Sequence, residues 1–159
     1  MPYLIDGNNL IGHMPDLHLK NRIDRSRLLT RLLAFQQVKN TRVVLVFDGP
    51  PDDNFAPEKF QGRAFSVRFP DIGENADSVI QDIISRETDL RQFFVVSSDR
   101  EIQRYAHASG AKTLKCEEFL RELKAARREH RESSEMEKSE ESPSPLEIKL
   151  WADLFRSKK

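Results

Sequence analysis

The chain has 159 residues, of which 38% are hydrophobic and 33% are charged, and its formal net charge at pH 7 is zero. This composition predicts one soluble globular domain of ordinary size with a short appendage. It excludes a protein whose overall charge draws it to nucleic acid or to anionic membranes, so any basic surface must be local. The single cysteine, Cys116, excludes an internal disulfide and a cysteine-rich zinc cluster, and is expected to be a small, partly buried apolar residue.

A membrane partner is not expected. The longest run of aliphatic and aromatic residues, Val43 to Phe47, is far shorter than the roughly 20 residues that a membrane-spanning helix needs. The first residues of the sequence follow a strand pattern and lack the basic and apolar regions of a secretory signal. The expected location is therefore the cytoplasm.

Strand and helix patterns alternate along residues 1–130. Apolar runs predict strands at 3–5, 43–47 and 93–96, an alternating run predicts one at 65–69, and a short strand is expected at 112–114. Helical spacing predicts helices at about 24–39, 76–86, 100–109 and 117–130. The run at 43–47 is continuously apolar, as in a parallel sheet covered on both faces, whereas 65–69 alternates and is expected at an edge or in an antiparallel pair. Residues 49–64 contain three prolines and two glycines and predict a long loop. The expected fold is three-layer α/β/α with a mostly parallel central sheet.

The composition changes after residue 130. Residues 131–145 carry five glutamates against one arginine and one lysine, with almost no apolar side chain, and predict a linker. Residues 146–159 place Leu150, Trp151, Leu154 and Phe155 at helical intervals and predict an amphipathic helix. Because an isolated helix of this length is marginal in water, docking on its own domain is favoured over docking on a partner.

Three of the predicted strands are followed by aspartates, namely Asp6, Asp48 and Asp99. Ligands of a parallel sheet bind outside the carboxyl ends of its strands, so these carboxylates are expected at one edge, with Asp77 facing them from the next helix. Gathered carboxylates repel one another, and a hard divalent cation, Mg²⁺ or Mn²⁺, relieves that repulsion. Such a cation activates water against a phosphodiester. Asn8 and Asn9 offer amide groups to a phosphate or to a water molecule.

Each aspartate alone also has a purely structural interpretation. Ser98 or Asp99 fits a helix N-cap, Asp48 before Gly49 fits a turn, and Asp77 fits an acidic first helical turn. Three strand-terminal aspartates at one predicted edge nevertheless favour a shared metal site.

The segments YLIDGNNL, VVLVFDG, GENADSVI and FFVVSSDREIQRYA, followed by SGAKTLKCEEFLREL and LEIKLWADLF, resemble the YacP-like branch of the NYN-domain proteins, which are related to the PIN-domain ribonucleases. The resemblance covers most of the chain except the acidic linker. It implies a PIN-like fold with a divalent-metal-dependent endoribonuclease site. In this resemblance Asp6, Asp77 and Asp99 match the acidic metal-binding positions, Asn8 matches a polar catalytic position, and Asp48 matches an Asp-Gly after the second strand. Ser78 stands where many relatives carry another acidic residue, which leaves a second metal open.

RNA is the expected partner, and its phosphates require positive charge near the site. The candidate RNA-binding residues are Arg100, Arg104, Arg22, Arg25, Lys59, Arg63 and Phe60. For each of them, ordinary solvated charge or loop anchoring is an equally open interpretation. Since the net charge is zero, the working hypothesis is that a ribosome or a decay complex presents single-stranded RNA, with messenger RNA as the expected substrate. The alternative is a non-catalytic RNA-binding or scaffold module on the same fold.

Overall fold

The computed structural model describes residues 1–51, 61–138 and 150. The elements follow one another as β1 (Tyr3–Asp6), α1 (Gly7–Gly12), α2 (Arg22–Lys39), β2 (Val43–Val46), β3 (Phe65–Arg68), α3 (Ala76–Arg86), β4 (Phe94–Val96), α4 (Arg100–Ser109), β5 (Lys112–Leu114) and α5 (Cys116–Lys138). The strands form one sheet in the order β3-β2-β1-β4-β5, and every neighbouring pair is parallel. The predicted α/β fold with a parallel central sheet is confirmed.

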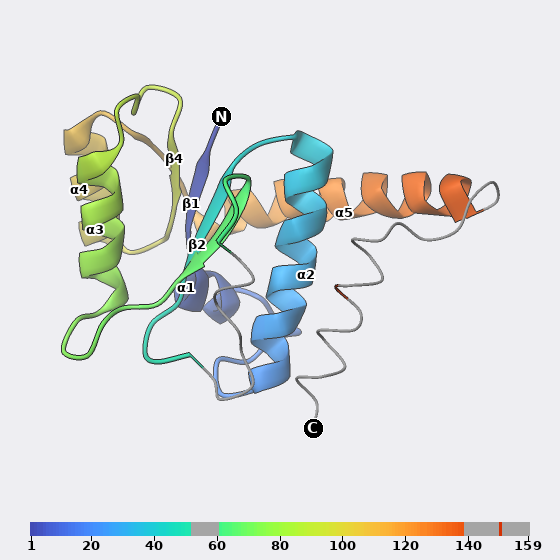
Figure 1. The fold of residues 1–159 in the computed structure, drawn as a ribbon, viewed down its shortest axis with the longest axis horizontal. Coiled ribbons are helices and arrows are strands. Elements are labelled where there is room, and N and C mark those ends of the chain that lie inside the picture. The colour runs from blue at the N-terminus through green and yellow to red at the C-terminus, as the bar shows by residue number, and fades with distance from the viewer. Residues whose placement is uncertain (52–60, 139–149, 151–159) are drawn as a thin grey trace.

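Two apolar cores lie on opposite faces of the sheet. Successive residues of a strand point to opposite faces, so Ile5 and Leu45 pack in the cluster that contains the buried residues of α2 and α5. Leu4 and Val44 pack in the cluster of α3 and α4. Figure 1 shows the same division, with α3 and α4 on one side of the strands and α2 and α5 on the other. Coverage on both faces explains why the central strands are continuously apolar.

Two elements differ from the sequence prediction. β3 lies at the sheet edge, as one of the two predictions had it, but it pairs with β2 in parallel. Its alternating pattern therefore reflects edge exposure: Phe65 and Val67 are buried, and Arg68 is exposed. The short helix α1 was not predicted, because glycine and asparagine are poor helix formers. It is held instead by the Asp6 cap and by burial of Leu10.

The last described helix is longer than predicted. α5 continues to Lys138, so residues 131–138, which were assigned to the linker, are helical. Arginine, glutamate and lysine are good helix formers, and the spacing of Arg131 and Glu135 places opposite charges one turn apart. The rest of the predicted linker and the predicted terminal helix lie outside the described residues, apart from Leu150. Within the part of the chain that the structure describes, no helix is long and apolar enough to cross a membrane.

Candidate active site at the carboxyl edge of the sheet

The four predicted aspartates lie at the same edge of the sheet. Asp6 ends β1 and caps α1, and Asp99 follows β4 and caps α4. Asp48 follows β2, and its Oδ1 accepts a 3.2 Å hydrogen bond from the backbone N–H of Ala76 at the start of α3. This bond fixes the start of α3, and with it Asp77, beside the end of β2.

These carboxylates lie close enough to repel one another. Burial, with smaller contributions from the negative charges of Asp77 and Asp99, raises the pKa of Asp6 to about 6, although hydrogen bonds from the N–H of Asn9 and the hydroxyl of Ser97 lower it. Burial also raises the pKa of Asp77, with additional repulsion from Asp99, Asp48 and Glu101. The edge therefore concentrates negative charge that the protein itself does not fully compensate.

Ser97 connects two of the aspartates and was missed at the sequence level. Its fully buried hydroxyl donates to Oδ2 of Asp6 over 3.2 Å and accepts from the backbone N–H of Asp99 over 3.1 Å. The carboxylate of Asp99 accepts from the N–H groups of Glu101 and Ile102, so Asp99, and not Ser98, is the cap of α4. The side chain of Ser97 thus sets the relative position of β1 and the start of α4.

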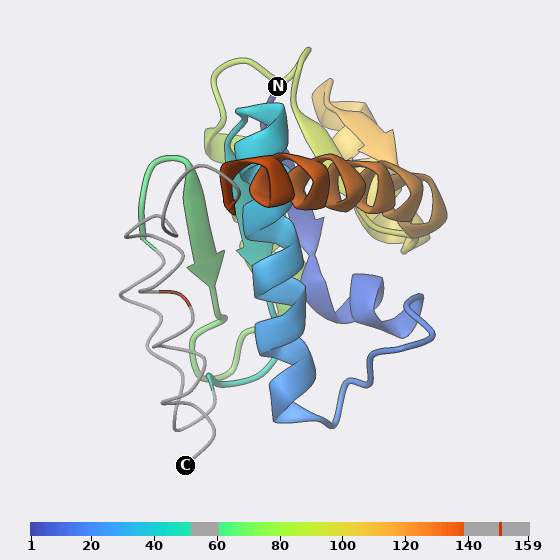
Figure 2. The same ribbon diagram turned by 90° about the vertical axis from the view of Figure 1, so that its right-hand side faces the viewer.

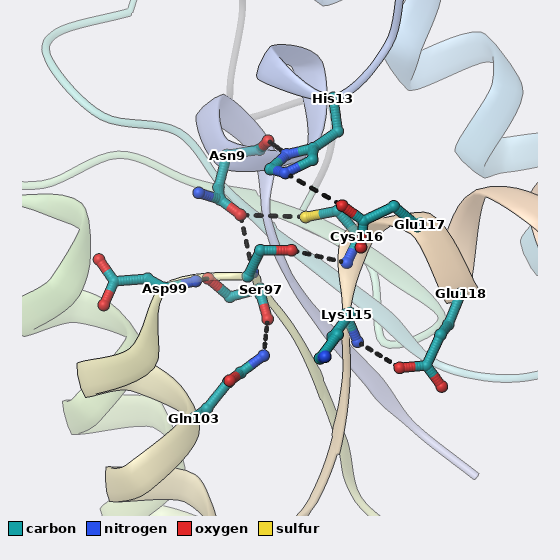
Figure 3. A network of polar contacts seen from close by, with 10 residues as sticks. Asn9, His13, Ser97, Asp99, Gln103, Lys115, Cys116, Glu117 and Glu118 are labelled. Carbon is teal, nitrogen blue, oxygen red and sulfur yellow. Dashed lines mark hydrogen bonds and ion pairs between the residues drawn. The ribbon is translucent and has the colours of Figure 1, made fainter.

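The two asparagines after Asp6 tie the first turn to its neighbours. Oδ1 of Asn8 accepts from the backbone N–H of Asp48 over 3.2 Å. Oδ1 of Asn9 accepts from the backbone N–H of Ser98 over 2.8 Å and from the thiol of Cys116 over 3.0 Å (Figure 3). Burial raises the pKa of this thiol, and Cys116 is completely buried rather than partly buried as predicted.

Gly7 makes the turn between β1 and α1 possible. A Cβ atom at this position would lie 2.8 Å from a ring carbon of Phe47, closer than packed carbon atoms approach. Only glycine lets α1 begin directly after Asp6 and against the end of β2.

The donor set matches a hard divalent cation in its chemistry but is not gathered into a finished coordination shell. Magnesium and manganese prefer carboxylate and carbonyl oxygens, which are the groups at this edge. Across residues 1–51 and 61–138, however, no group of three or more histidine, cysteine, aspartate or glutamate side chains is arranged to hold a metal ion. Asp6 and Asp99 each accept a backbone N–H as helix caps, so binding an ion would require these side chains to share or exchange those bonds.

The predicted RNA-binding cations are only partly brought together. Arg25 donates to the carbonyl oxygen of Asp48 over 3.2 Å and lies over the Phe47 ring, at the carboxylate edge. Arg100 and Arg104 are exposed on the first turns of α4, directly after Asp99.

Arg63 lies elsewhere. It precedes β3, next to Ala64, whose carbonyl oxygen accepts from the N–H of Val43 at the amino end of β2. Arg63 is therefore at the edge opposite the aspartates. The side chain of Arg22, and residues Lys59 and Phe60, lie outside what the structure describes.

Comparison with known proteins agrees with the geometry. The family described as YacP-like NYN domain matches residues 3–157. The chain belongs to this family. Two similar solved structures are of Rae1 (YacP) from Bacillus subtilis. One has 28% identity and a TM-score of 0.71, covering 87% of this chain and 83% of that chain. The other, of a tryptophan-to-leucine variant, has 25% identity and a TM-score of 0.70, covering 99% and 92%. No curated protein sequence matches the chain.

Membership of the YacP-like NYN family indicates a nuclease-type, RNA-related function. Ser78, which the resemblance sets against an acidic residue in many relatives, has a structural role in this YacP-like domain. Its N–H and its hydroxyl both donate to Oδ1 of Asn75, over 2.9 and 3.0 Å, and complete the cap of α3. The carboxylate edge thus consists of Asp6, Asp77 and Asp99, with Asp48 beside them.

Proposed function

We propose that this protein is a divalent-metal-dependent endoribonuclease that hydrolyses phosphodiester bonds of single-stranded RNA, with messenger RNA as its substrate and Mg²⁺ or Mn²⁺ as its cofactor. The observation that carries the proposal is the gathering of Asp6, Asp77 and Asp99 at one sheet edge, where burial, with a smaller contribution from the other two charges, raises the pKa of Asp6 to about 6. Buried carboxylates that repel each other cost free energy of folding, and a bound cation removes that cost.

The residues of the edge have distinct tasks in this proposal. Asp6, Asp77 and Asp99 hold the cation, which when bound acidifies a water molecule and neutralises charge on the phosphate. Asp48 is a further candidate ligand; its Oδ1, like that of Asp99, already accepts two backbone N–H groups. Asn8 acts by holding the Asp48 turn against α1. Arg25, Arg100 and Arg104 supply positive charge to the RNA backbone next to the carboxylates.

Presentation of the RNA by a ribosome or a decay complex is part of the proposal. The chain has a formal net charge of zero, so long-range attraction to naked RNA is weak. A larger assembly would deliver the strand to the edge without relying on that attraction.

The test is cleavage of a 5′-labelled single-stranded RNA with Mg²⁺ or Mn²⁺, with and without ribosomes, comparing the wild type with Asp6→Asn and Asp77→Asn. Asp89→Asn is the matched control, because it removes one negative charge from the loop before β4, near the amino edge. We expect cleavage by the wild type and by Asp89→Asn, and none by the two edge variants or after chelation with EDTA. Cleavage that survives Asp6→Asn would refute the assignment.

The second candidate function is a non-catalytic RNA-binding or scaffold module. The observation in its favour is that Asp6 and Asp99 act as helix caps and that the described carboxylates do not form a ready coordination shell. It predicts RNA binding without metal-dependent cleavage under any of these conditions.

A further inference from the structure

Between Glu118 and Glu132, helix α5 separates its charges onto two sides of its buried face, whereas Glu117 and Glu135 lie on the basic side at its two ends. Phe119, Leu123 and Ala126 are buried and define the face that packs against the domain. On one side lie five basic residues, which we name the basic stripe: Arg121, Lys124, Arg127, Arg128 and Arg131. On the other side lie Glu118, Glu122, Glu129 and Glu132. At 3.6 residues per turn the stripe covers about a third of the helix circumference and is about 15 Å long.

Two pairs of residues in the stripe repel each other, although Glu117, Glu132 and Glu135 stand one turn from Arg121, Arg128 and Arg131. Lys124 and Arg128, and likewise Arg127 and Arg131, are like charges one helical turn apart, a spacing that destabilises a helix. Within the described part of the chain, no ion pair or hydrogen bond reaches the five side chains of the stripe. If the charges of α5 contributed only to solubility, we would expect positive and negative residues to alternate over its exposed surface. The concentration of positive residues on this side therefore points to an anionic ligand.

A neighbouring arginine on α2 increases the positive charge. Burial lowers the pKa of Arg127, and the charges of Arg31 and Arg131 lower it further, while Asp16 acts in the opposite direction. Asp16 is already paired with Arg31. The single carboxylate of Asp16 thus stands against the guanidinium groups of Arg31, Arg127 and Arg131. Positive charge is in excess among these four groups, where α5 crosses α2 (Figure 2).

Helix α5, which carries the stripe, begins beside the candidate active site. Cys116, the first residue of α5, donates from its thiol to Oδ1 of Asn9 and from its backbone N–H to the hydroxyl oxygen of Ser98. From there α5 leads across α2 and beyond it (Figures 1 and 2). Arg131 is 15 residues further along, about 22 Å at 1.5 Å per residue. A strand that leaves the carboxylate edge in this direction would pass along the stripe.

We propose that the basic stripe of α5 binds the phosphodiester backbone of single-stranded RNA away from the bond that is cut, so that the substrate must extend for several nucleotides beyond the cleavage site. This inference rests on the proposed function for the identity of the ligand. Guanidinium and ammonium groups bind phosphate without reading sequence, so the stripe contributes affinity and direction but no sequence preference.

Binding is tested in the full-length chain carrying Asp6→Asn, so that cleavage does not interfere. The stripe variant combines Lys124→Gln, Arg128→Gln and Arg131→Gln, all at exposed positions. The matched control combines Lys39→Gln, Arg86→Gln and Arg91→Gln, which are also exposed and change the net charge equally. The probe is a fluorescent, unstructured single-stranded RNA of 20 nucleotides, and anisotropy is followed over a series of KCl concentrations.

The stripe variant is expected to bind at least tenfold more weakly at low salt, and the slope of log affinity against log salt should fall by about 2, since each lost single-strand phosphate contact removes about 0.7. The control triple should bind as its parent does. A variant with Lys124→Arg, Arg128→Lys and Arg131→Lys should retain binding, because it keeps the charges.

The inference would be overturned if the stripe and control variants lost binding equally, or if the parent did not bind the RNA. It would also be overturned if the stripe variant lost binding only to a duplex RNA probe, or if the charge-conserving variant bound as weakly as the glutamine variant. Circular dichroism of each variant establishes that α5 is still folded. Because binding is measured without cleavage, absence of nuclease activity in the wild type would refute the proposed function while leaving a positive stripe result intact.

Discussion

Asp6 is the residue at which the conflict between stability and function is clearest. It is 7% exposed, and its pKa of about 6 lies above the ordinary value of 3.8. The folded protein therefore holds a proton on Asp6 that the unfolded chain has already released between these two values. The contribution of neutral Asp6 to stability is fully present below pH 3.8 and is lost as the pH rises through about 6.

The metal-free Asp6→Asn variant should therefore be more stable than the wild type at neutral pH. Asparagine resembles the neutral acid, so in EDTA at a pH above 7 we expect a gain in unfolding free energy of about 2–3 kcal/mol. Near the ordinary pKa of aspartate the gain should disappear. Urea denaturation at the two pH values measures both. A variant less stable than the wild type at neutral pH would show that the charge on Asp6 is compensated within the protein.

The same pair of proteins reports on the metal. Adding Mg²⁺ or Mn²⁺ at neutral pH should raise the thermal midpoint of the wild type, because the ion binds the folded state alone. It should leave Asp6→Asn unchanged, whereas Asp89→Asn should respond as the wild type does. An equal shift in all three proteins would mean that the cation acts non-specifically and not at the carboxylate edge.

Ser97 is expected to be a positioning residue for the same edge. Ser97→Ala removes the hydroxyl that donates to Asp6 and that accepts from the N–H of Asp99. Such supporting hydrogen bonds commonly matter by about 10- to 100-fold, so kcat should fall by that order. Because this bond lowers the pKa of Asp6, NMR titration in EDTA should find a higher pKa in the variant. Ser97→Thr keeps the hydroxyl and should retain activity. Unchanged kcat and pKa in Ser97→Ala would contradict this role.

At the scale of elements, the turn at Asp48 links β2 to α3. Its Oδ1 accepts from the N–H groups of Gly49 and Ala76, and its own N–H donates to Asn8. Asp48→Ala leaves the first two donors without their acceptor and should lower the unfolding free energy by about 1–2 kcal/mol.

The companion variant separates this structural role from metal binding. Asp48→Asn keeps Oδ1 and should retain both the stability and most of the cleavage activity, as measured by urea denaturation and the labelled-RNA assay. If Asp48→Asn were as inactive as Asp6→Asn, Asp48 would be a ligand rather than a residue that positions α3.

The elements were predictable where the physical signal is local. Buried parallel strands give continuous apolar runs, and Gly110 ends α4 in the left-handed conformation that favours glycine. The bounds of the buried strands and of α4 were therefore predicted to within a residue or two. α1 was not, because burial and not helix propensity stabilises it. The proximity of Asp6 and Asp99 could be predicted because each follows a strand, and the carboxyl ends of parallel strands lie at the same edge of a sheet. The role of Ser97 depends on a contact across 91 positions, which one sequence does not reveal.

At the scale of the whole molecule, charge is segregated rather than absent. The formal net charge is zero, yet the sheet edge concentrates carboxylates and α5 concentrates arginines. Attraction to RNA therefore depends on a few local contacts, and each is weakened as salt competes for the phosphates. We therefore expect that a partner holds the RNA substrate at cellular ionic strength.

This distribution predicts how cleavage responds to salt. Cleavage of naked single-stranded RNA should fall by an order of magnitude or more between about 50 and 200 mM KCl, since binding weakens with every phosphate contact that the salt displaces. With ribosomes carrying the same RNA, the fall should be much smaller, because the strand is held by the assembly and not by Arg25, Arg100 and Arg104. Initial rates measured across the salt series compare the two conditions.

The Asp6→Asn variant is the control in both conditions: it should not cleave the RNA at any salt concentration, and cleavage that it retains would refute the assignment of the site. Tight binding of naked RNA that is insensitive to salt would contradict the whole-molecule argument, since binding through a few phosphate contacts weakens as the salt concentration rises. An identical salt dependence with and without ribosomes would mean that the protein captures its RNA unaided. The proposal that a larger assembly presents the RNA is supported only if the cleavage rate depends less on salt with ribosomes than without them.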